Sequence, residues 1–252
     1  MSMSASPTLA RALAACLACG LSLAATAHAM APSTVPQAVP DTLAQRLVAC
    51  TSCHARVDAR GNPVNDVYFP RIGGKPAGYL YNQLLNFREG RRQYPLMTYL
   101  VEHLPDPYLR EIAGHFAALP PAAHAATASQ VTPQVLERGR QLVFNGDASR
   151  KLPACVACHG QRLTGVEPAI PGLLGLPRDY VNAQFGAWRN KARRAHAPDC
   201  MAGITARLSF EDVAAVSGWL AAQPVPADPR PSPAASIARP LPIACGSAPE
   251  AP

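Results

Sequence analysis

The chain has 252 residues, carries a net charge of +7 at pH 7 and is 48% hydrophobic. This length fits one large domain or two domains of roughly 100–130 residues each. The mildly basic charge comes without aromatic interleaving or a nucleic-acid reader motif, so solubility explains it better than nucleic-acid binding does.

Residues 1–29 predict a secretory signal peptide. Arg11 is their only charged residue, a short apolar run follows it, and AHA at 27–29 has the small-x-small pattern of a cleavage site. A lipoprotein cleavage box ending at Cys16 is the less favoured alternative, because the apolar run before it is only four residues long. No later segment is long and apolar enough to span a bilayer. We therefore expect export to the bacterial periplasm, a mature net charge of +6 without Arg11, and an N-terminal extension over residues 30–40.

Three helices are predicted in a first domain over residues 41–120. They begin at Asp41 as a cap, after Pro76, and at Asp106-Pro107, a cap followed by proline at the first helical position. Their apolar residues recur at helical spacing. These residues are Leu43, Leu47, Tyr79, Leu80, Leu84, Phe87, Leu109, Ile112 and Phe116.

A Pro/Ala/Ser-rich linker over 121–131 separates this domain from a second one over 132–225. The two domains align with each other: GHFAALP at 114–120 matches GWLAAQP at 218–224, which indicates a tandem repeat. Helices of the second domain are expected after Thr132-Pro133, after Pro177, and after a capping box of Ser209 and Asp212. Strand alternation is absent, so the expected fold class is all-α. Domains this small, with long loops, usually need a covalent cross-link or a cofactor to be stable.

Each domain contains one Cys-x-x-Cys-His motif, in VACTSCHAR at 48–56 and PACVACHGQ at 153–161. This motif is the attachment signature of a c-type haem: both thiols form thioethers with the porphyrin, and the histidine binds the iron. It predicts two covalently attached haem c groups, held by Cys50, Cys53 and His54 and by Cys155, Cys158 and His159. A thioredoxin-like pair would need a βαβ pattern, and a zinc site of four cysteines would not need both histidines. We therefore favour haem attachment over both alternatives.

The sixth iron ligands are expected to be Met97 and Met201. They are the only methionines after Met30, and they follow His54 and His159 by 43 and 42 residues. Alternatives remain at both irons: Cys200 and His196 lie near the second methionine, and His103 is a weaker competitor at the first. Met/His ligation raises the reduction potential and closes the iron to small molecules, which is typical of an electron carrier.

Several residues are expected to surround the haems. The carbonyl groups of Pro70 and Pro171 stand at equivalent places and could accept the Nδ1 proton of each histidine. Packing on the haem faces or near their carboxylates is expected for Tyr79, Phe87, Tyr180 and Trp188. A basic run in each domain is interpreted as a solvated helix end rather than a docking patch. These runs comprise Arg88, Arg91, Arg92, Arg189, Lys191, Arg193 and Arg194.

Over residues 41–225 the chain resembles the dihaem class I cytochromes c of the cytochrome c4 type. The resemblance is carried by CTSCH, CVACH, YLYNQLLNFREGRRQYPLM before the first methionine, and FEDVAAVSGWLAAQP after the second. It implies two tandem class I domains, each a few short helices around one haem, with the haems close across a pseudo-twofold interface. It also implies electron shuttling in the periplasm, often to a terminal oxidase. Two departures are Cys200 and a Pro-rich tail over 226–252.

The sequence therefore predicts a periplasmic carrier of single electrons rather than an enzyme. Its expected partners are respiratory redox proteins such as a quinol-cytochrome c reductase, a terminal oxidase or a periplasmic dehydrogenase, at the membrane surface or away from it. The alternatives are a dihaem peroxidase, which would need an exchangeable ligand on one iron, and a dehydrogenase-associated cytochrome subunit.

Haem attachment leaves two cysteines of the mature chain unassigned, Cys200 and Cys245. An oxidising compartment favours a disulfide between them. Nine prolines in 224–252 keep the tail extended, so it can run back across the second domain and fix the loop of Met201. Two unrelated thiols are the alternative.

Overall fold

The computed structural model describes residues 42–61, 64, 66, 68–121 and 131–248. The predicted signal peptide, the cap at Asp41, the N-terminal extension and most of the linker lie outside these residues. We refer to 42–121 as the first half, to 131–248 as the second half, and to 226–248 as the tail.

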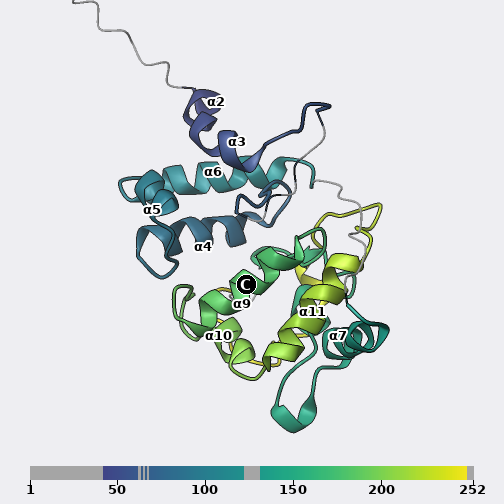
Figure 1. Ribbon diagram of the computed structural model, residues 1–252. Coiled ribbons are helices and arrows are strands. Elements are labelled where there is room, and N and C mark those ends of the chain that lie inside the picture. Colours follow the sequence, from purple (N-terminus) through teal and green to yellow (C-terminus); the bar gives the residue numbers. More distant parts are fainter. Residues whose placement is uncertain (1–41, 62–63, 65, 67, 122–130, 249–252) are drawn as a thin grey trace, which may run out of the picture. The chain divides into compact units, whose positions relative to one another are not determined.

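The first half is helical (Figure 1). Its helices are α2 (Leu43–Arg46), α3 (Val48–His54), α4 (Ala77–Arg88), α5 (Pro95–Val101) and α6 (Asp106–Ala118). Helix α4 packs against α6. Between them lies a core that includes Leu80, Ile112 and Phe116, each no more than 6% exposed.

The second half also has two long helices packed against each other, α7 and α11 (Figure 1). Its elements are α7 (Pro133–Asn145), η1 (Ala148–Arg150), α8 (Val156–His159), β1 (Gly165–Val166), β2 (Ile170–Pro171), α9 (Arg178–Arg189), α10 (Cys200–Thr205), α11 (Phe210–Ala222) and η2 (Ala234–Ser236). Helix α11 packs closely against α7 and also contacts α9. The all-α expectation holds except for the short antiparallel pair of β1 and β2, in which Gly165 faces Pro171 and Val166 faces Ile170.

Side-chain caps mark where α2, α7, α10 and α11 begin. The predicted caps at Thr132 and Ser209 are confirmed: each side-chain oxygen accepts from a backbone N–H one turn ahead, and Asp212 completes a capping box. Asp106, predicted as a cap, is instead the first residue of α6, and Pro105 occupies the cap position. The Asp106 carboxylate accepts hydrogen bonds from Arg88 and Tyr81. It therefore ties α6 to α4 instead of capping α6.

The two halves meet through backbone hydrogen bonds along the segments that follow α4 and α9. The Gln93 N–H donates to the Ala192 carbonyl at 2.7 Å, and the Arg194 N–H donates to the Arg91 carbonyl at 2.7 Å. A third bond joins the Gly78 N–H to the Pro168 carbonyl at 3.0 Å. In the part of the chain that the structure describes, no helix is long and apolar enough to cross a bilayer.

Candidate functional site

A cavity of about 180 Å³ lies in the first half between the motif helix and α5. Helix α3 presents Cys53 and His54 to it, and α5 presents Met97 from another side. Cys50, on the same helix, packs against the core behind the cavity. The structure therefore brings the predicted histidine and methionine of the first motif to one cavity.

The second half contains a matching cavity of about 190 Å³. Cys155, Cys158 and His159 line it from α8 and the residue before this helix, and Met201 lines it from α10. The volumes of the two cavities agree within 10 Å³. Each motif thus opens onto its own cavity, which separates the two Cys-x-x-Cys pairs and leaves no zinc site shared by all four cysteines.

Both histidines are oriented as the sequence predicts. The Nδ1 of His54 lies 2.7 Å from the Pro70 carbonyl, and the Nδ1 of His159 lies 2.8 Å from the Pro171 carbonyl. A carbonyl can only accept, so Nδ1 carries the proton and Nε2 keeps its lone pair for a metal. Burial lowers the pKa of both histidines, against the opposing effect of these hydrogen bonds, and so favours the neutral ring.

The motif cysteines are partly buried. Burial raises the pKa of Cys155 to about 12 and, less strongly, the pKa of Cys50 and of Cys158. All four motif cysteines are free of disulfides. Their sulfur atoms are therefore available for thioether bonds.

Six residues line both cavities, and we call them the shared wall. They are Lys75, Tyr79, Gln83, Tyr180, Gln184 and Arg193. The Arg193 guanidinium donates to Gln184 at 2.7 Å and to Gln83 at 3.1 Å. In the reciprocal arrangement, Arg92 donates to Gln83 at 3.0 Å and to Gln184 at 2.9 Å. The two halves are thus joined by a near-symmetric polar cluster between the cavities.

This cluster corrects the interpretation of the two basic runs as solvated helix ends. Arg193 is only 6% exposed, and Arg92 pairs with it in an antiparallel bridge. The side chains also stack, Arg92 on Phe87 and Arg193 on Trp188. Interleaved aromatic and amide groups hold Arg193 inside the molecule and Arg92 partly buried, which the sequence of each run alone does not reveal.

The cavities fit haem. Among the described residues, Arg92 and Arg193 form no ion pair with a carboxylate, although buried charges usually have one. The indole N–H of Trp188, on the wall of the second cavity, is buried and has no acceptor in the described part of the chain. Haem carries two carboxylates, which can accept from these donors. The shared wall would hold those carboxylates, and the motif cysteines would hold the opposite, vinyl-bearing side.

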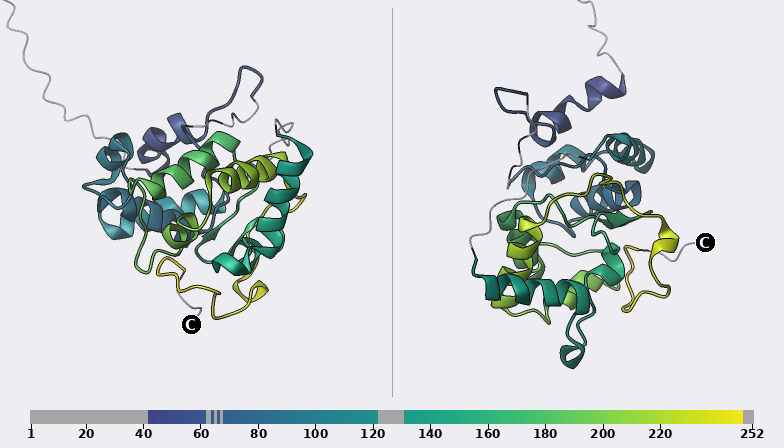
Figure 2. Two further views of the ribbon diagram at one scale, coloured as in Figure 1. Left: turned by 60° about the horizontal axis from the view of Figure 1, so that its bottom comes forward. Right: turned by 90° about the vertical axis from the view of Figure 1, so that its right-hand side faces the viewer.

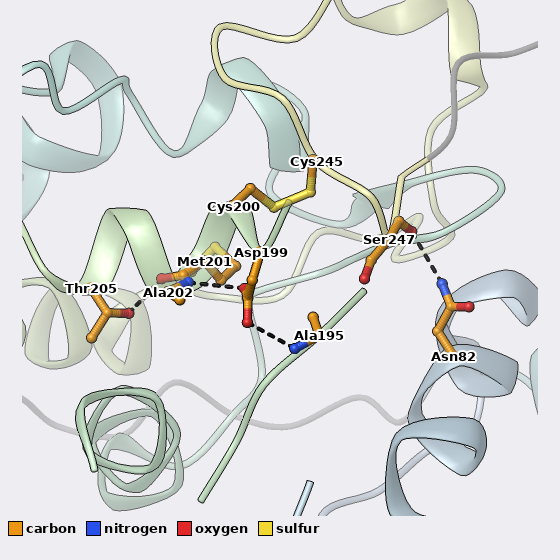
Figure 3. Close-up of a disulfide and its surroundings, with 9 residues drawn as sticks. All are labelled: Asn82, Ala195, Asp199, Cys200, Met201, Ala202, Thr205, Cys245 and Ser247. Atoms are coloured by element: carbon orange, nitrogen blue, oxygen red, sulfur yellow. Dashed lines mark hydrogen bonds between the residues drawn. A yellow bond between two sulfur atoms is a disulfide. The ribbon is translucent and has the colours of Figure 1, made fainter. Parts of the chain in front are cut away.

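The structure removes the rival ligands at the second methionine. Cys200 and Cys245 form a disulfide, so the Cys200 sulfur is not free to bind iron (Figure 3). His196 is directed to Arg91, with its Nε2 3.1 Å from the guanidinium. In the first half, the side chain of His103 is 91% exposed and lies beside Glu102. Met97 and Met201 remain the methionine sulfurs that face the cavities.

Short-range bonds hold Met201 in place (Figure 3). The Asp199 carboxylate caps α10 by accepting from the Ala202 N–H at 3.0 Å, and it accepts from the Ala195 N–H at 2.7 Å. The Met201 carbonyl accepts from the Thr205 hydroxyl at 2.7 Å. Together with the disulfide, these contacts fix the backbone on both sides of the methionine.

Comparison with known proteins shows to which family the chain belongs. No protein-family model matches the chain. The thiosulfate dehydrogenase electron acceptor of Stutzerimonas stutzeri is 34% identical over 174 residues, which are 69% of this chain and 78% of that protein. Cytochrome c4 of Pseudomonas aeruginosa is 30% identical over 178 residues, which are 69% of this chain and 84% of that protein. The chain belongs to the cytochrome c4 family. The crystal structure of reduced cytochrome c4 from Pseudomonas stutzeri superposes with a TM-score of 0.57 at 26% identity, over 70% of this chain and 94% of that one.

Membership in the cytochrome c4 family confirms the two tandem c-type domains, the two covalently attached haem groups and electron transfer as the function. Haem supplies reversible one-electron chemistry when it is bound. The protein chain supplies the environment of the haem groups. Its carbonyl groups set the tautomer of each histidine, its buried walls exclude water, and one cationic wall is common to both cavities.

Proposed function

We propose that this protein is a periplasmic carrier that accepts single electrons from a dehydrogenase of the thiosulfate dehydrogenase type and is not itself an enzyme. The observation that carries the proposal is the similarity to the electron acceptor of Stutzerimonas stutzeri, which extends over 78% of that protein. A dehydrogenase-associated cytochrome subunit was an alternative in the sequence analysis. This similarity favours a dehydrogenase over a quinol-cytochrome c reductase as the electron donor. A terminal oxidase remains a suitable final acceptor.

We further propose the ligand sets. Cys50 and Cys53 attach the first haem, with His54 and Met97 as axial ligands. In the second half, the attachment residues are Cys155 and Cys158, and the axial ligands are His159 and Met201. The presence of one methionine on the wall of each cavity supports a closed pair of irons and argues against a peroxidase. The proposed domain boundaries are 41–120 and 132–225, with a signal peptide over 1–29.

The rim of the first cavity is the proposed contact surface for the dehydrogenase. Tyr68 and Leu96 line this cavity and are 76% and 47% exposed, and Tyr94 beside them is 38% exposed. Apolar side chains that border a cofactor cavity and face solvent are typical of transient redox interfaces. A donor that docks there reaches the first haem over a short distance.

Reduction by a purified thiosulfate dehydrogenase tests the donor. The oxidised holoprotein is mixed with catalytic dehydrogenase and thiosulfate, and the reduced haem band is followed by stopped-flow spectroscopy. We expect full reduction of both haems that depends on thiosulfate and on dehydrogenase. Leu96→Glu should slow this reduction at least tenfold, whereas Phe210→Glu, at a 78% exposed position in the second half, should not. Reduction no faster than with thiosulfate alone would reject this donor.

A further inference from the structure

The disulfide between Cys200 and Cys245 joins the tail to the helix that carries Met201 (Figure 3). The tail leaves α11, passes through the single turn η2 and returns to α10 (Figure 2, yellow). Cys200 directly precedes Met201, and both line the second cavity together with Cys245. The disulfide is therefore part of the cavity wall, next to the proposed iron ligand.

The end of the tail is fixed to the molecule by contacts that do not involve α10. Cys245 packs against a buried cluster that includes Val166, which is 0% exposed, and Ala248, which is 8% exposed. The Asn82 side chain, on α4 of the first half, donates to the Ser247 carbonyl at 3.1 Å (Figure 3). The disulfide thus fastens the start of α10 to a segment that is itself anchored elsewhere.

Without the disulfide, α10 is held by weaker restraints. The helix has six residues, whereas isolated helices shorter than roughly 12–15 residues are marginal in water. Its approach segment is linked to the tail by the Gly246 N–H, which donates to the Pro198 carbonyl at 2.9 Å. Cutting the disulfide leaves this hydrogen bond and the Asp199 cap in place, but it removes the covalent restraint beside Met201.

The disulfide lies near the surface of the second half. Cys200 and Cys245 are each partly buried, and the neighbouring residues Pro198, Ala244 and Gly246 are exposed. A small dithiol can therefore approach the sulfur atoms from solvent.

The first methionine has no such disulfide beside it. Leu96 stands directly before Met97, in the place that Cys200 has before the second methionine. The cysteines of the first half are Cys50 and Cys53, and both are free of disulfides. A thiol reagent that cuts the disulfide therefore changes the restraint on one methionine of the two.

We propose that the Cys200–Cys245 disulfide is a thiol-exchange site through which a dithiol reductant releases the restraint on Met201 at the second haem. The inference rests on the proposed function, because it assumes that Met201 binds the second iron. A disulfide restricts the chain most when it closes a long loop, and this one joins residues 45 positions apart. With the disulfide intact Met201 stays on the iron, and with the disulfide cut it dissociates more often.

The exchange proceeds in two steps. A thiolate of the dithiol attacks one sulfur of the disulfide, the S–S bond breaks, and a mixed disulfide forms. The second thiol of the reagent then displaces the protein sulfur from this mixed disulfide. In total Cys200 and Cys245 gain two electrons and two protons, and the dithiol becomes a disulfide.

Carbon monoxide binding to the reduced, full-length holoprotein tests the proposal, because the gas binds a ferrous iron only after the methionine has left it. Ascorbate reduces the haem groups and spares the disulfide, and subsequent dithiothreitol cuts the disulfide as well. Alkylation and mass spectrometry verify the state of Cys200 and Cys245. We expect carbon monoxide to bind one haem per chain at least tenfold faster after dithiothreitol than in ascorbate alone.

Variants assign this change to the disulfide and to the second haem. The double variant Cys200→Ser/Cys245→Ser should bind carbon monoxide rapidly in ascorbate alone, with no further change on addition of dithiothreitol. In a Met97→His background, the rapid phase should persist. Arg230→Gln is the control, at a position in the tail that is 77% exposed, and it should bind as slowly as the wild type in ascorbate.

The proposal is overturned if dithiothreitol leaves the disulfide intact, if binding stays slow after the disulfide is cut, or if Met97→His removes the rapid phase. The wild-type comparison between the two reductants decides the matter even where the double variant fails to bind haem. An error in the proposed ligand set has its own signature: the oxidised protein would lack a methionine-to-iron charge-transfer band before any reductant is added, and the inference would fall with it. No dehydrogenase takes part, so a failed donor assay leaves this test intact.

Discussion

At the scale of single residues, the two methionines differ in what restrains them. Met201 is adjacent to the Cys200–Cys245 disulfide and follows the Asp199 cap. Met97 lies on the short helix α5, which has no side-chain cap. Met201 is therefore flanked by a disulfide and a helix cap, whereas near Met97 it is the Thr98 hydroxyl that ties α5 to α4, by donating to the Phe87 carbonyl at 3.3 Å.

Met97→His should lower the reduction potential of the first haem and leave the second nearly unchanged. An imidazole in place of a thioether favours Fe(III), because it is a harder donor. Potentiometric titration measures both potentials, and the intensity of the methionine-to-iron charge-transfer band should fall by about half. Met201→His is the reciprocal variant and should lower only the second potential. Equal shifts of both haems in either variant would contradict the assignment of one methionine to each cavity.

Asp212 is a second residue with a distinct environment. Its side chain is 6% exposed and accepts from Arg150, Arg138 and the Ser209 N–H. Burial raises the pKa of this carboxyl, but the hydrogen bonds from Arg150, Ser209 and Arg138 together outweigh it, and the net shift is downward. Asp212 therefore stabilises the folded state above the unfolded pKa of about 3.9, and this contribution is lost as pH falls through the folded value.

Asp212→Asn should lower the free energy of unfolding by about 2 kcal/mol at pH 7, because two guanidinium groups lose their charged acceptor. The difference between wild type and variant should narrow as pH falls below about 4, where the wild-type carboxyl becomes protonated. Urea denaturation at pH 7 and pH 3, followed by far-UV circular dichroism, provides both values. A difference that does not depend on pH would show that the carboxylate charge has no role.

At the scale of elements, the crossing of α7 and α11 depends on Gly139. A Cβ atom added there would lie 2.2 Å from the Ala215 carbonyl oxygen and 2.7 Å from the Trp219 Cβ. The Ala215 carbonyl oxygen and the Trp219 Cβ are both fixed by the backbone of α11, so side-chain rotation cannot move either atom away. The absence of a side chain is what lets the two helices approach so closely.

Gly139→Ala should destabilise the protein by about 2 kcal/mol through overpacking at this crossing. Gly186→Ala in α9 is the control, because a Cβ there meets nothing within 4 Å. The control should be neutral or stabilise by up to about 1 kcal/mol through helix propensity. Thermal unfolding of the oxidised holoproteins compares the two. A stable Gly139→Ala protein would mean that the helices can separate at little cost.

Sequence reasoning succeeds where a local signal exists. The caps at Thr132 and Ser209 and the attachment motifs depend on neighbouring residues, so they were predictable. Helices α5 and α10 were not predicted, because they have only seven and six residues and turn Met97 and Met201 toward a cavity rather than toward another helix. The shared wall was not predicted, because the residues that bond to each other there are about a hundred positions apart in the sequence. A basic run has the same sequence pattern whether it faces solvent or another domain.

At the scale of the whole molecule, the shared wall makes the two haem sites electrostatically interdependent. Arg193 lines both cavities and is 6% exposed. Burial lowers its pKa, as does the neighbouring charge of Arg92, while Tyr79 and Tyr180 oppose this effect. A cation at this place acts on both sites, unlike an axial ligand.

Arg193→Met should lower the reduction potentials of both haems, because each loses a buried positive charge. The same potentiometric titration gives the two values, and haem content per chain verifies that the sites are intact. Arg140→Gln is the control: Arg140 is 46% exposed, forms an i,i+3 pair with Glu137, and should leave both potentials unchanged. A fall confined to one haem would show that the wall serves only that site.

The Cys200–Cys245 disulfide has a consequence for how this molecule is made. Four cysteines must stay reduced until thioethers form, while two others must be oxidised, and all six belong to one chain. Cys245 is synthesised after every motif cysteine, so its partner waits through the emergence of the whole tail. Once the second half has folded, burial keeps Cys155 protonated and therefore a poor nucleophile for thiol exchange, with its pKa raised to about 12. Burial of Cys155 thus limits its exchange with the Cys200–Cys245 pair once the second half has folded.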